Sequence, residues 1–124
     1  MTRFSKTFAA FSLLFLTSFA FACDYPERPS IPDGVTASKD ELLAAKDAIQ
    51  QFIADVDSYL QCIESEEQSA VAELDNPSAE EIQRREEMLN KKFDAANQEK
   101  ALLGEQFNQQ IRLYNARLQE EKPD

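Results

Sequence analysis

The feature that most constrains the fold of this chain is an apolar side chain that recurs at helical spacing over two long segments. In the first segment, an apolar residue repeats every seven positions, at Leu42, Ile49, Val56 and Ile63. A second series follows three positions later, at Ala45, Phe52 and Tyr59. This heptad pattern is typical of a helix that packs along one seam against another helix, as in a coiled coil.

The ends of this first helix are marked by residues with known capping behaviour. Ser38 and Glu41 have the spacing of a capping box, in which each side chain accepts a hydrogen bond from the other residue's backbone N–H. A residue that precedes proline disfavours helical geometry, so the helix must end before Asp75-Asn76-Pro77. We therefore expect the first helix to run from about residue 39 to about residue 72.

The second segment carries apolar residues whose mean spacing is close to the 3.6 residues of a helical turn. They are Ile82, Leu89, Phe93, Ala96, Leu103, Phe107, Ile111, Tyr114 and Leu118. Lys100 interrupts this stripe. The helix starts either at Asn76, with Pro77 in the first helical position, or at Ser78. The predicted helix covers residues 78–121, and the predicted fold is all-α, an antiparallel two-helix hairpin over residues 38–124 that resembles a coiled coil.

The lengths of the two predicted helices leave part of the second without a helical neighbour. If the helices pair about a turn near Asp75, the start of the first helix lies beside Arg112, and residues 114–118 extend beyond it. Either the turn around Ile31 and Val35 or another molecule must cover this overhang. A hairpin buries little surface on both sides, so we expect a protein partner or a homodimer that forms through helical faces.

Residues 1–22 have the pattern of a cleaved signal peptide. Arg3 and Lys6 precede an uncharged, mostly apolar run over residues 8–19, which is too short to anchor the chain in a bilayer. Ala20-Phe21-Ala22 has the small-x-small form of a signal peptidase site, so cleavage would leave Cys23 as the first residue. We expect a periplasmic or secreted bacterial protein.

The cysteine at this position also fits a second interpretation, a membrane-anchored lipoprotein in which the Cys23 thiol carries a lipid. Lipoprotein signals usually have an aliphatic residue three positions before the cysteine and a small residue two positions before it. Ala20 and Phe21 stand there in this chain, which departs from that pattern. Membrane contact is expected only in this alternative.

Residues 23–37 form a proline-rich segment that we call the strip. Pro26, Pro29 and Pro32 recur every third residue, which is the period of polyproline II. An extended strip that turns at Pro32-Asp33-Gly34 can run back antiparallel on the first helix. Cys23 can then reach Cys62, and in an oxidising compartment an even cysteine count favours a disulfide. The alternatives are intermolecular bridges, or a lipidated Cys23 with a lone Cys62.

Residues 23–63, about a third of the chain, resemble the N-terminal half of a group of small secreted bacterial proteins of unknown function. These proteins combine a Cys/Pro-rich N-terminal strip with a helix that ends in Tyr-Leu-x-Cys. The residues that carry the resemblance are Cys23, Pro26, Pro29, Pro32, Asp33, Gly34, Tyr59, Leu60 and Cys62. The resemblance supports bacterial export and implies no activity.

The composition excludes most common functional sites. The chain has no His and only two Gly, so His-based catalytic systems, His-ligated metals and glycine-rich phosphate loops cannot be formed. The net charge is −10, and removal of Arg3 and Lys6 makes it −12. Such a chain repels nucleic acid. We expect no catalytic residues, no cofactor and no metal.

The negative charge is concentrated around the predicted turn. No Lys or Arg occurs between Asp47 and Gln83. The acidic residues of this region are Asp47, Asp55, Asp57, Glu64, Glu66, Glu67, Glu73, Asp75, Glu80 and Glu81. They form either an acidic surface that binds a basic partner or weakly holds divalent cations, or a solvated face that keeps an exported protein soluble. Glu64, Glu66 and Glu67 are the candidate partner residues.

Three functional hypotheses fit these observations. The first is a non-enzymatic exported module that presents a helical face to a partner or serves as a structural protein. The second is a periplasmic holdase-like chaperone that contacts unfolded chains through Tyr114 and Leu118. The third is a thiol-disulfide reagent, which the sequence disfavours because Cys23 and Cys62 lack both the CxxC spacing and basic neighbours.

Overall fold

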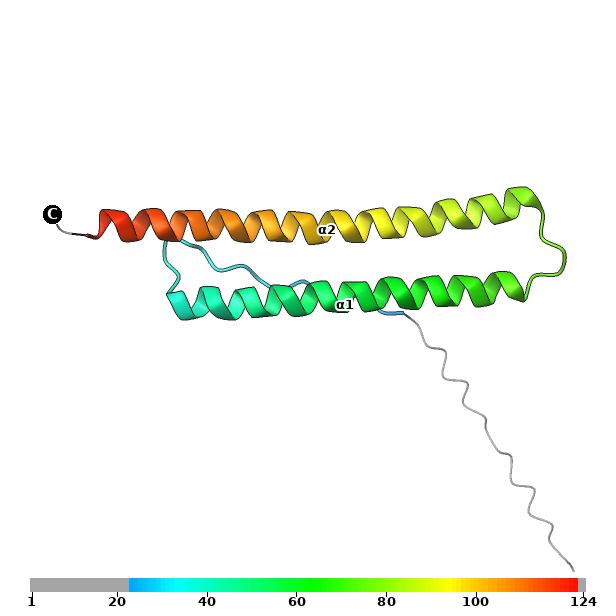
Figure 1. The fold of residues 1–124 in the computed structure, drawn as a ribbon, viewed down its shortest axis with the longest axis horizontal. Coiled ribbons are helices and arrows are strands. Elements are labelled where there is room, and N and C mark those ends of the chain that lie inside the picture. The colour runs from blue at the N-terminus through cyan, green and yellow to red at the C-terminus, as the bar shows by residue number, and fades with distance from the viewer. Residues whose placement is uncertain (1–22, 123–124) are drawn as a thin grey trace, which may run out of the picture.

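The computed structural model describes residues 23–122, which form two long antiparallel helices and a shorter extended segment (Figure 1). Helix α1 comprises Lys39–Ala72 and helix α2 comprises Ala79–Glu120. The predicted helical hairpin is confirmed, with helix ends within one residue of those expected. The predicted signal peptide, residues 1–22, lies outside the described part of the chain.

Both helices begin with a side-chain cap, as the sequence predicts. The backbone N–H of Glu41 donates to the Ser38 hydroxyl at 3.2 Å, and the backbone N–H of Ser38 donates to the Glu41 carboxylate at 2.7 Å. At α2, the sequence leaves two candidate caps open. The structure selects Ser78, which accepts from the Glu81 N–H, whereas Asn76 lies in the turn with a φ of 49°. Asparagine tolerates this left-handed conformation better than most residues.

The core lies between the helices and is confined to one half of the hairpin. Val56 of α1 and Leu103 of α2 are fully buried at its centre. The buried residues of α1 are Leu42, Ala45, Ile49, Phe52, Val56, Leu60 and Ile63. Those of α2 are Ala96 and Leu103. No described residue between Ile63 and Ala96 is buried, so the end of the hairpin near the turn has no closed core.

One member of the predicted heptad stripe is replaced. Leu60, not Tyr59, packs into the core, and Tyr59 is half-buried beside it. A straight helix has 3.6 residues per turn, so its apolar stripe drifts around the helix relative to a strict seven-residue repeat. The drift turns Tyr59 towards the strip, where its ring centroid lies 5.0 Å from that of Tyr25.

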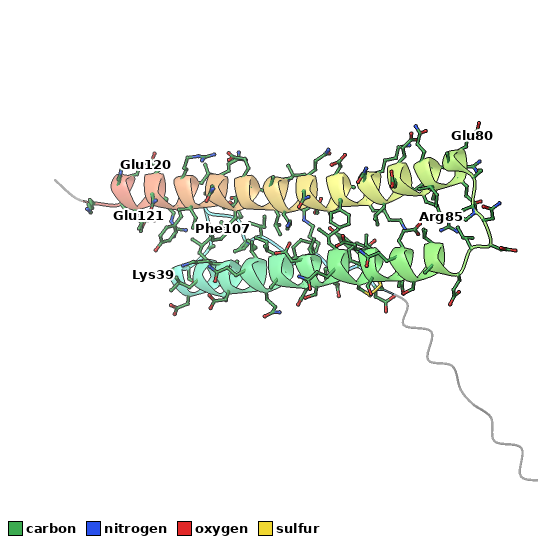
Figure 2. All side chains as sticks on the ribbon, turned by 45° about the vertical axis from the view of Figure 1, so that its right-hand side comes forward. Lys39, Glu80, Arg85, Phe107, Glu120 and Glu121 are labelled. Carbon is green, nitrogen blue, oxygen red and sulfur yellow. A yellow bond between two sulfur atoms is a disulfide. The ribbon has the colours of Figure 1, made fainter. Side chains whose placement is uncertain are left out.

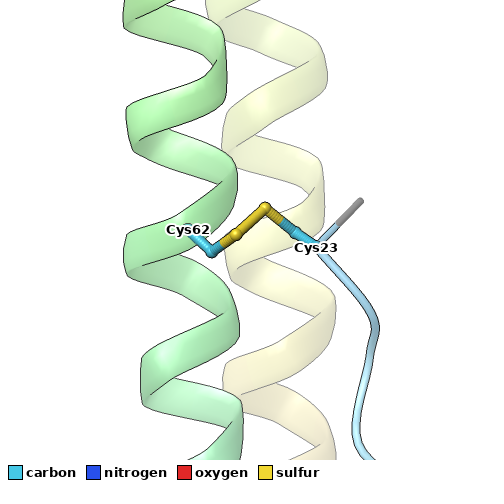
Figure 3. Close-up of a disulfide and its surroundings, with 2 residues drawn as sticks. All are labelled: Cys23 and Cys62. Carbon is cyan, nitrogen blue, oxygen red and sulfur yellow. A yellow bond between two sulfur atoms is a disulfide. The ribbon is translucent and has the colours of Figure 1, made fainter. Parts of the chain in front are cut away.

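The strip is extended, as predicted, and its end is joined to α1 by a disulfide between Cys23 and Cys62 (Figure 3). The strip packs on the first helix, as expected, and it also contacts the second helix. Tyr25 packs against Phe52 of α1, whereas Arg28 lies 3.2 Å from Glu99 of α2. The groove between two helices offers walls on both sides, so a segment lying in it buries more surface than one on a single helix.

The turn at the C-terminal end of the strip packs against α2 at the other end of the hairpin. α2 extends beyond the start of α1, as expected, and Glu120 and Glu121 lie past Lys39 (Figure 2). Arg117 donates hydrogen bonds to the backbone carbonyls of Val35 and Ala37, at 2.7 and 2.9 Å. The overhang was expected to be covered either by the chain's own turn or by another molecule, and the turn lies on it.

Candidate interaction surface at the turn end of the hairpin

The half of the hairpin near the interhelical turn, residues 63–92, is covered less than the rest, and we call it the distal half. The N-terminal end of the strip is Cys23, which is bonded to Cys62 at the border of the distal half. Beyond that point, the two helices pack only against each other within the described chain. Leu89 is only half-buried, and Met88 is 60% exposed. The distal half therefore keeps apolar side chains in contact with solvent.

A groove opens on the distal half where the strip ends. It has a volume of about 270 Å³ and is lined by Ile63, Glu66, Glu67, Ala70, Arg85, Met88, Leu89 and Lys92. Its border with the strip is marked by Glu66, whose carboxylate lies within 4.8 Å of the sulfur atoms of Cys23 and Cys62. Lys92 also lines a separate hollow beside Tyr25. We call the groove lined by Ile63, Ala70 and Met88 the strip-face groove.

A second groove lies on the distal half and is lined by a different set of side chains. Its volume is about 310 Å³, and its residues are Glu64, Glu67, Gln68, Val71, Ile82, Arg85, Glu86 and Leu89. An ion pair between Glu67 and Arg85, with a distance of 3.0 Å, joins the two helices and contributes to both grooves. We call the second depression the Glu64 groove, because Glu64 lines it and does not line the first.

Most acidic residues of this region have no basic partner among the described residues. Asp57 pairs with Lys100 at 2.6 Å, and Arg85 pairs with Glu67 and, at 4.0 Å, with Glu81. Within residues 63–92, the acids that form no ion pair with a described residue are Glu64, Glu66, Glu73, Asp75, Glu80, Glu86 and Glu87. The last turn of α1 also contains no basic residue to offset the negative end of the helix dipole. Residues 63–92 contain nine acidic and four basic residues, so the distal half carries a net charge of −5.

The structure separates the two predicted partner surfaces. Glu64, Glu66 and Glu67 lie in the distal half, whereas Tyr114 and Leu118 lie at the opposite end of α2. Tyr114 is half-buried beneath the turn, and the Arg117 guanidinium lies 5.1 Å from the centroid of its ring. Leu118 remains 38% exposed. The two sets cannot form one site.

The structure also tests the two cysteines as chemical groups. Cys23, Cys62 and Glu66 place their donor atoms within 4.8 Å of one another, which is close enough to share a metal ion. Both sulfur atoms are bonded to each other, so neither is a thiolate that could coordinate a metal. In this state the two cysteines serve as a covalent clip.

Sequence reasoning missed three side chains of the strip-face groove: Ala70, Met88 and Lys92. Their positions lie beside the main apolar stripes and not within them. Met88 precedes Leu89 on the edge of the α2 stripe, and a flexible, exposed methionine is common at surfaces that bind varied partners. Met88 is visible in the sequence, but its exposure in a groove depends on which side of α2 the strip leaves uncovered.

Within residues 23–122, neither helix combines the length and the apolar character needed to cross a membrane. The disulfide between Cys23 and Cys62 is typical of proteins that fold in an oxidising compartment. No protein family, no curated protein and no solved structure matches this chain.

Proposed function

We propose that the protein is an exported, non-enzymatic interaction module whose distal half binds a basic polypeptide partner. The observation that supports this most directly is a coincidence of two properties in one place. Residues 63–92 are the least covered part of the hairpin and also carry seven acidic side chains that form no ion pair with a described residue. Apolar grooves on a surface with net negative charge favour a partner that combines apolar and basic side chains.

Export is supported by the cysteine pair and by the N-terminal sequence. Residues 1–22 have the charge and apolar pattern of a signal peptide, and Cys23 directly follows its predicted cleavage site. A sulfur atom in a disulfide cannot also carry a lipid thioether. The bond between Cys23 and Cys62 therefore favours a secreted or periplasmic protein over the lipid-anchored alternative.

The charge also favours a different protein over a second copy as the partner of the distal half. Two copies that meet through this surface would bring Glu64, Glu66 and their neighbours against the same residues of the other copy. Like charges brought together at an interface cost binding free energy. A homodimer through another helical face is not affected by this argument.

The chaperone hypothesis receives less support. Its proposed contact surface was the overhang around Tyr114 and Leu118, and the turn covers part of that overhang through Gly34 and Arg117. Suppression of aggregation of an unfolded outer-membrane protein at stoichiometric amounts would restore this hypothesis.

Site-specific photo-crosslinking in an exporting bacterium tests the proposed function. A photoreactive amino acid is placed at Met88 in the distal half or at Leu43 near the start of α1; these residues are 60% and 48% exposed. We expect protein adducts at Met88 and not at Leu43. Equal labelling at both positions would contradict a localised partner surface.

A charge control separates this surface from the effect of net charge. Replacing Glu64, Glu66 and Glu73 with Gln should greatly reduce the Met88 adducts. Replacing the same number of acids outside the distal half, by Asp40→Asn, Asp47→Asn and Glu120→Gln, should leave them, because exposed charges beyond roughly 8 Å are screened at physiological salt. Equal loss of Met88 adducts in both variants would mean that the distal acids act only through net charge and form a solvated face.

A further inference from the structure

The strip shows which kind of peptide fits the groove between α1 and α2. It is extended, carries proline at every third position, places the partly exposed ring of Tyr25 against Phe52 and Tyr59, and pairs Arg28 with Glu99 of α2. Arg28 also donates to the side-chain oxygen of Gln106. The recognition therefore combines an extended backbone, an aromatic anchor and one basic side chain held by α2.

The strip-face groove begins where this segment ends and offers similar apolar walls and a carboxylate, beside two bases, Arg85 and Lys92. Ile63, Ala70 and Met88 supply apolar walls, as Phe52 and Tyr59 do under Tyr25. Glu66 supplies an acid that forms no ion pair with a described residue, in the role that Glu99 has towards Arg28. The strip therefore indicates the kind of peptide that the neighbouring strip-face groove can bind.

We propose that the strip-face groove binds a short extended segment of the partner, rich in proline and carrying a Lys or Arg that pairs with Glu66. This inference rests on the proposed function and names the binding mode. Ile63 and Ala70 are seven residues apart, so they span roughly 10 Å at 1.5 Å per helical residue. A polyproline II segment advances about 3.1 Å per residue, so three to four residues fill the groove.

The Glu64 groove is the main competing location within the distal half. It lacks a neighbouring extended segment that continues into it, and its acids include Glu64 and Glu86. Glu67 is shared by both grooves and is already paired with Arg85. The two locations therefore differ in two residues that can be changed separately, Glu66 for the strip-face groove and Glu64 for the other.

The probe is a labelled synthetic peptide that copies residues 25–32 with the change Glu27→Lys, which gives Tyr-Pro-Lys-Arg-Pro-Ser-Ile-Pro with blocked ends. Binding to the oxidised chain is measured by fluorescence anisotropy at physiological salt. A contact this small corresponds to a Kd on the order of 0.1 mM. The same peptide with Asp in place of both basic residues should not bind.

Two matched pairs of variants locate the peptide. Ala70→Trp fills the strip-face groove and Gln68→Trp crowds the Glu64 groove, two residues away on the same helix. Glu66→Lys and Glu64→Lys change the net charge equally. We expect Ala70→Trp and Glu66→Lys to weaken peptide binding by about tenfold or more. The control variants Gln68→Trp and Glu64→Lys should weaken it by less than about threefold.

The outcomes separate this inference from the proposed function. Equal weakening by Glu66→Lys and Glu64→Lys would mean non-specific attraction and would overturn the assigned groove. Loss of binding only with Gln68→Trp and Glu64→Lys would place the ligand in the Glu64 groove, against the inference. Absence of peptide binding, with Met88 photo-adducts retained, would overturn this binding mode while leaving the interaction module in place. Circular dichroism verifies that each variant keeps its helices.

Discussion

At the scale of single residues, the two glycines have opposite relations to their surroundings. The N–H of Gly34 donates to the Gln110 side chain at 2.9 Å. A Cβ at Gly34 would overlap the backbone carbonyl oxygen of Gln110 and lie 3.1 Å from the backbone nitrogen of Tyr114. A Cβ at Gly104, in the middle of α2, would meet no atom within 4 Å. The turn can approach α2 only because Gly34 has no side chain.

The same substitution should therefore have opposite effects at these two positions. Gly34→Ala forces the turn away from α2 and should lower the free energy of unfolding by about 1–3 kcal/mol. Gly104→Ala should raise it by about 1 kcal/mol, because alanine is the better helix former. Urea denaturation followed by circular dichroism measures both. A stabilised Gly34→Ala variant would contradict the described contact.

The capping box at the start of α1 predicts a pH dependence. Hydrogen bonds from the backbone and hydroxyl of Ser38 lower the pKa of Glu41. A lowered folded-state pKa adds stability above the unfolded-state value, and this contribution is lost as the pH falls through the folded-state pKa. Glu41→Gln keeps the shape of the side chain but removes its charge, so it should lower the free energy of unfolding at pH 7. This difference from the parent should shrink as the pH falls from 7 towards about 3. Urea midpoints across this pH range test it, and a constant difference would exclude the Glu41 charge as its source.

At the scale of elements, the strip depends on its disulfide. Its other attachments are the packing of Ile31 against the core, the aromatic contacts of Tyr25, the contacts of Arg28 with Glu99 and Gln106, and the hydrogen bonds of the turn. The bond between Cys23 and Cys62 closes a loop with a sequence separation of 39 residues. Without it, the strip would have to be ordered by those contacts alone.

Removing the disulfide should therefore destabilise the hairpin and release the strip. The loss of loop-closure entropy gives an upper value of about 4 kcal/mol for Cys23→Ser with Cys62→Ser. Burial, together with Glu99 and Tyr59, raises the pKa of Tyr25 in the folded chain. That pKa should return towards its ordinary value in the variant. Ultraviolet titration of tyrosine and urea denaturation provide the two readouts, and unchanged values in both would contradict the described attachment.

The helices contribute unequally along their length. Leu103 is fully buried between α1 and the rest of the core, whereas Met88 of the same helix is 60% exposed. Leu103→Ala should cost about 2–5 kcal/mol, because it leaves a cavity in a closed core. Met88→Ala should cost well under 1 kcal/mol, because an exposed side chain loses little buried surface. Thermal unfolding compares the two variants, and equal costs would contradict the confined core.

At the scale of the whole molecule, buried side chains and the proposed binding surface occupy different lengths of the hairpin. The strip and most buried residues lie between the start of α1 and the disulfide, and the strip-face and Glu64 grooves lie towards the interhelical turn. Segments with few buried contacts open locally at low free-energy cost. A docking surface in such a segment can adjust its helices to a partner without loss of the remaining fold.

Hydrogen exchange should reveal this division directly. Backbone amides of residues 64–92 should exchange through local opening, and those around Val56 and Leu103 only through global unfolding. Mass spectrometry of peptic fragments after deuterium labelling measures both regions in one experiment. Uniform protection along α1 and α2 would contradict the unequal coverage. The basic probe peptide should increase protection in residues 64–92 alone.

Much of the fold could be predicted from the sequence, because its determinants are local. Apolar periodicity, the Ser38 cap and the break at Asn76-Pro77 define both helices, and Cys23 with Cys62 defines the clip. Lys100 shows the limit of such patterns. It interrupts the α2 stripe in the sequence, and in the structure it forms an ion pair with Asp57 of α1. Arg85 likewise has Glu81 as its helical neighbour, yet Glu67 of the other helix is closer.

By itself, the sequence determined the two helices, their caps, the extended strip, the cysteine pair and the place where negative charge accumulates. The tertiary structure decided which surfaces are covered: the strip contacts both helices, Gly34 and Arg117 close the overhang, and the distal half stays open. The physical reason is one of range. Helix formation and capping depend on residues within a few positions of one another. Coverage depends on how the two helices are rotated and shifted against each other, and on where the disulfide ends the strip.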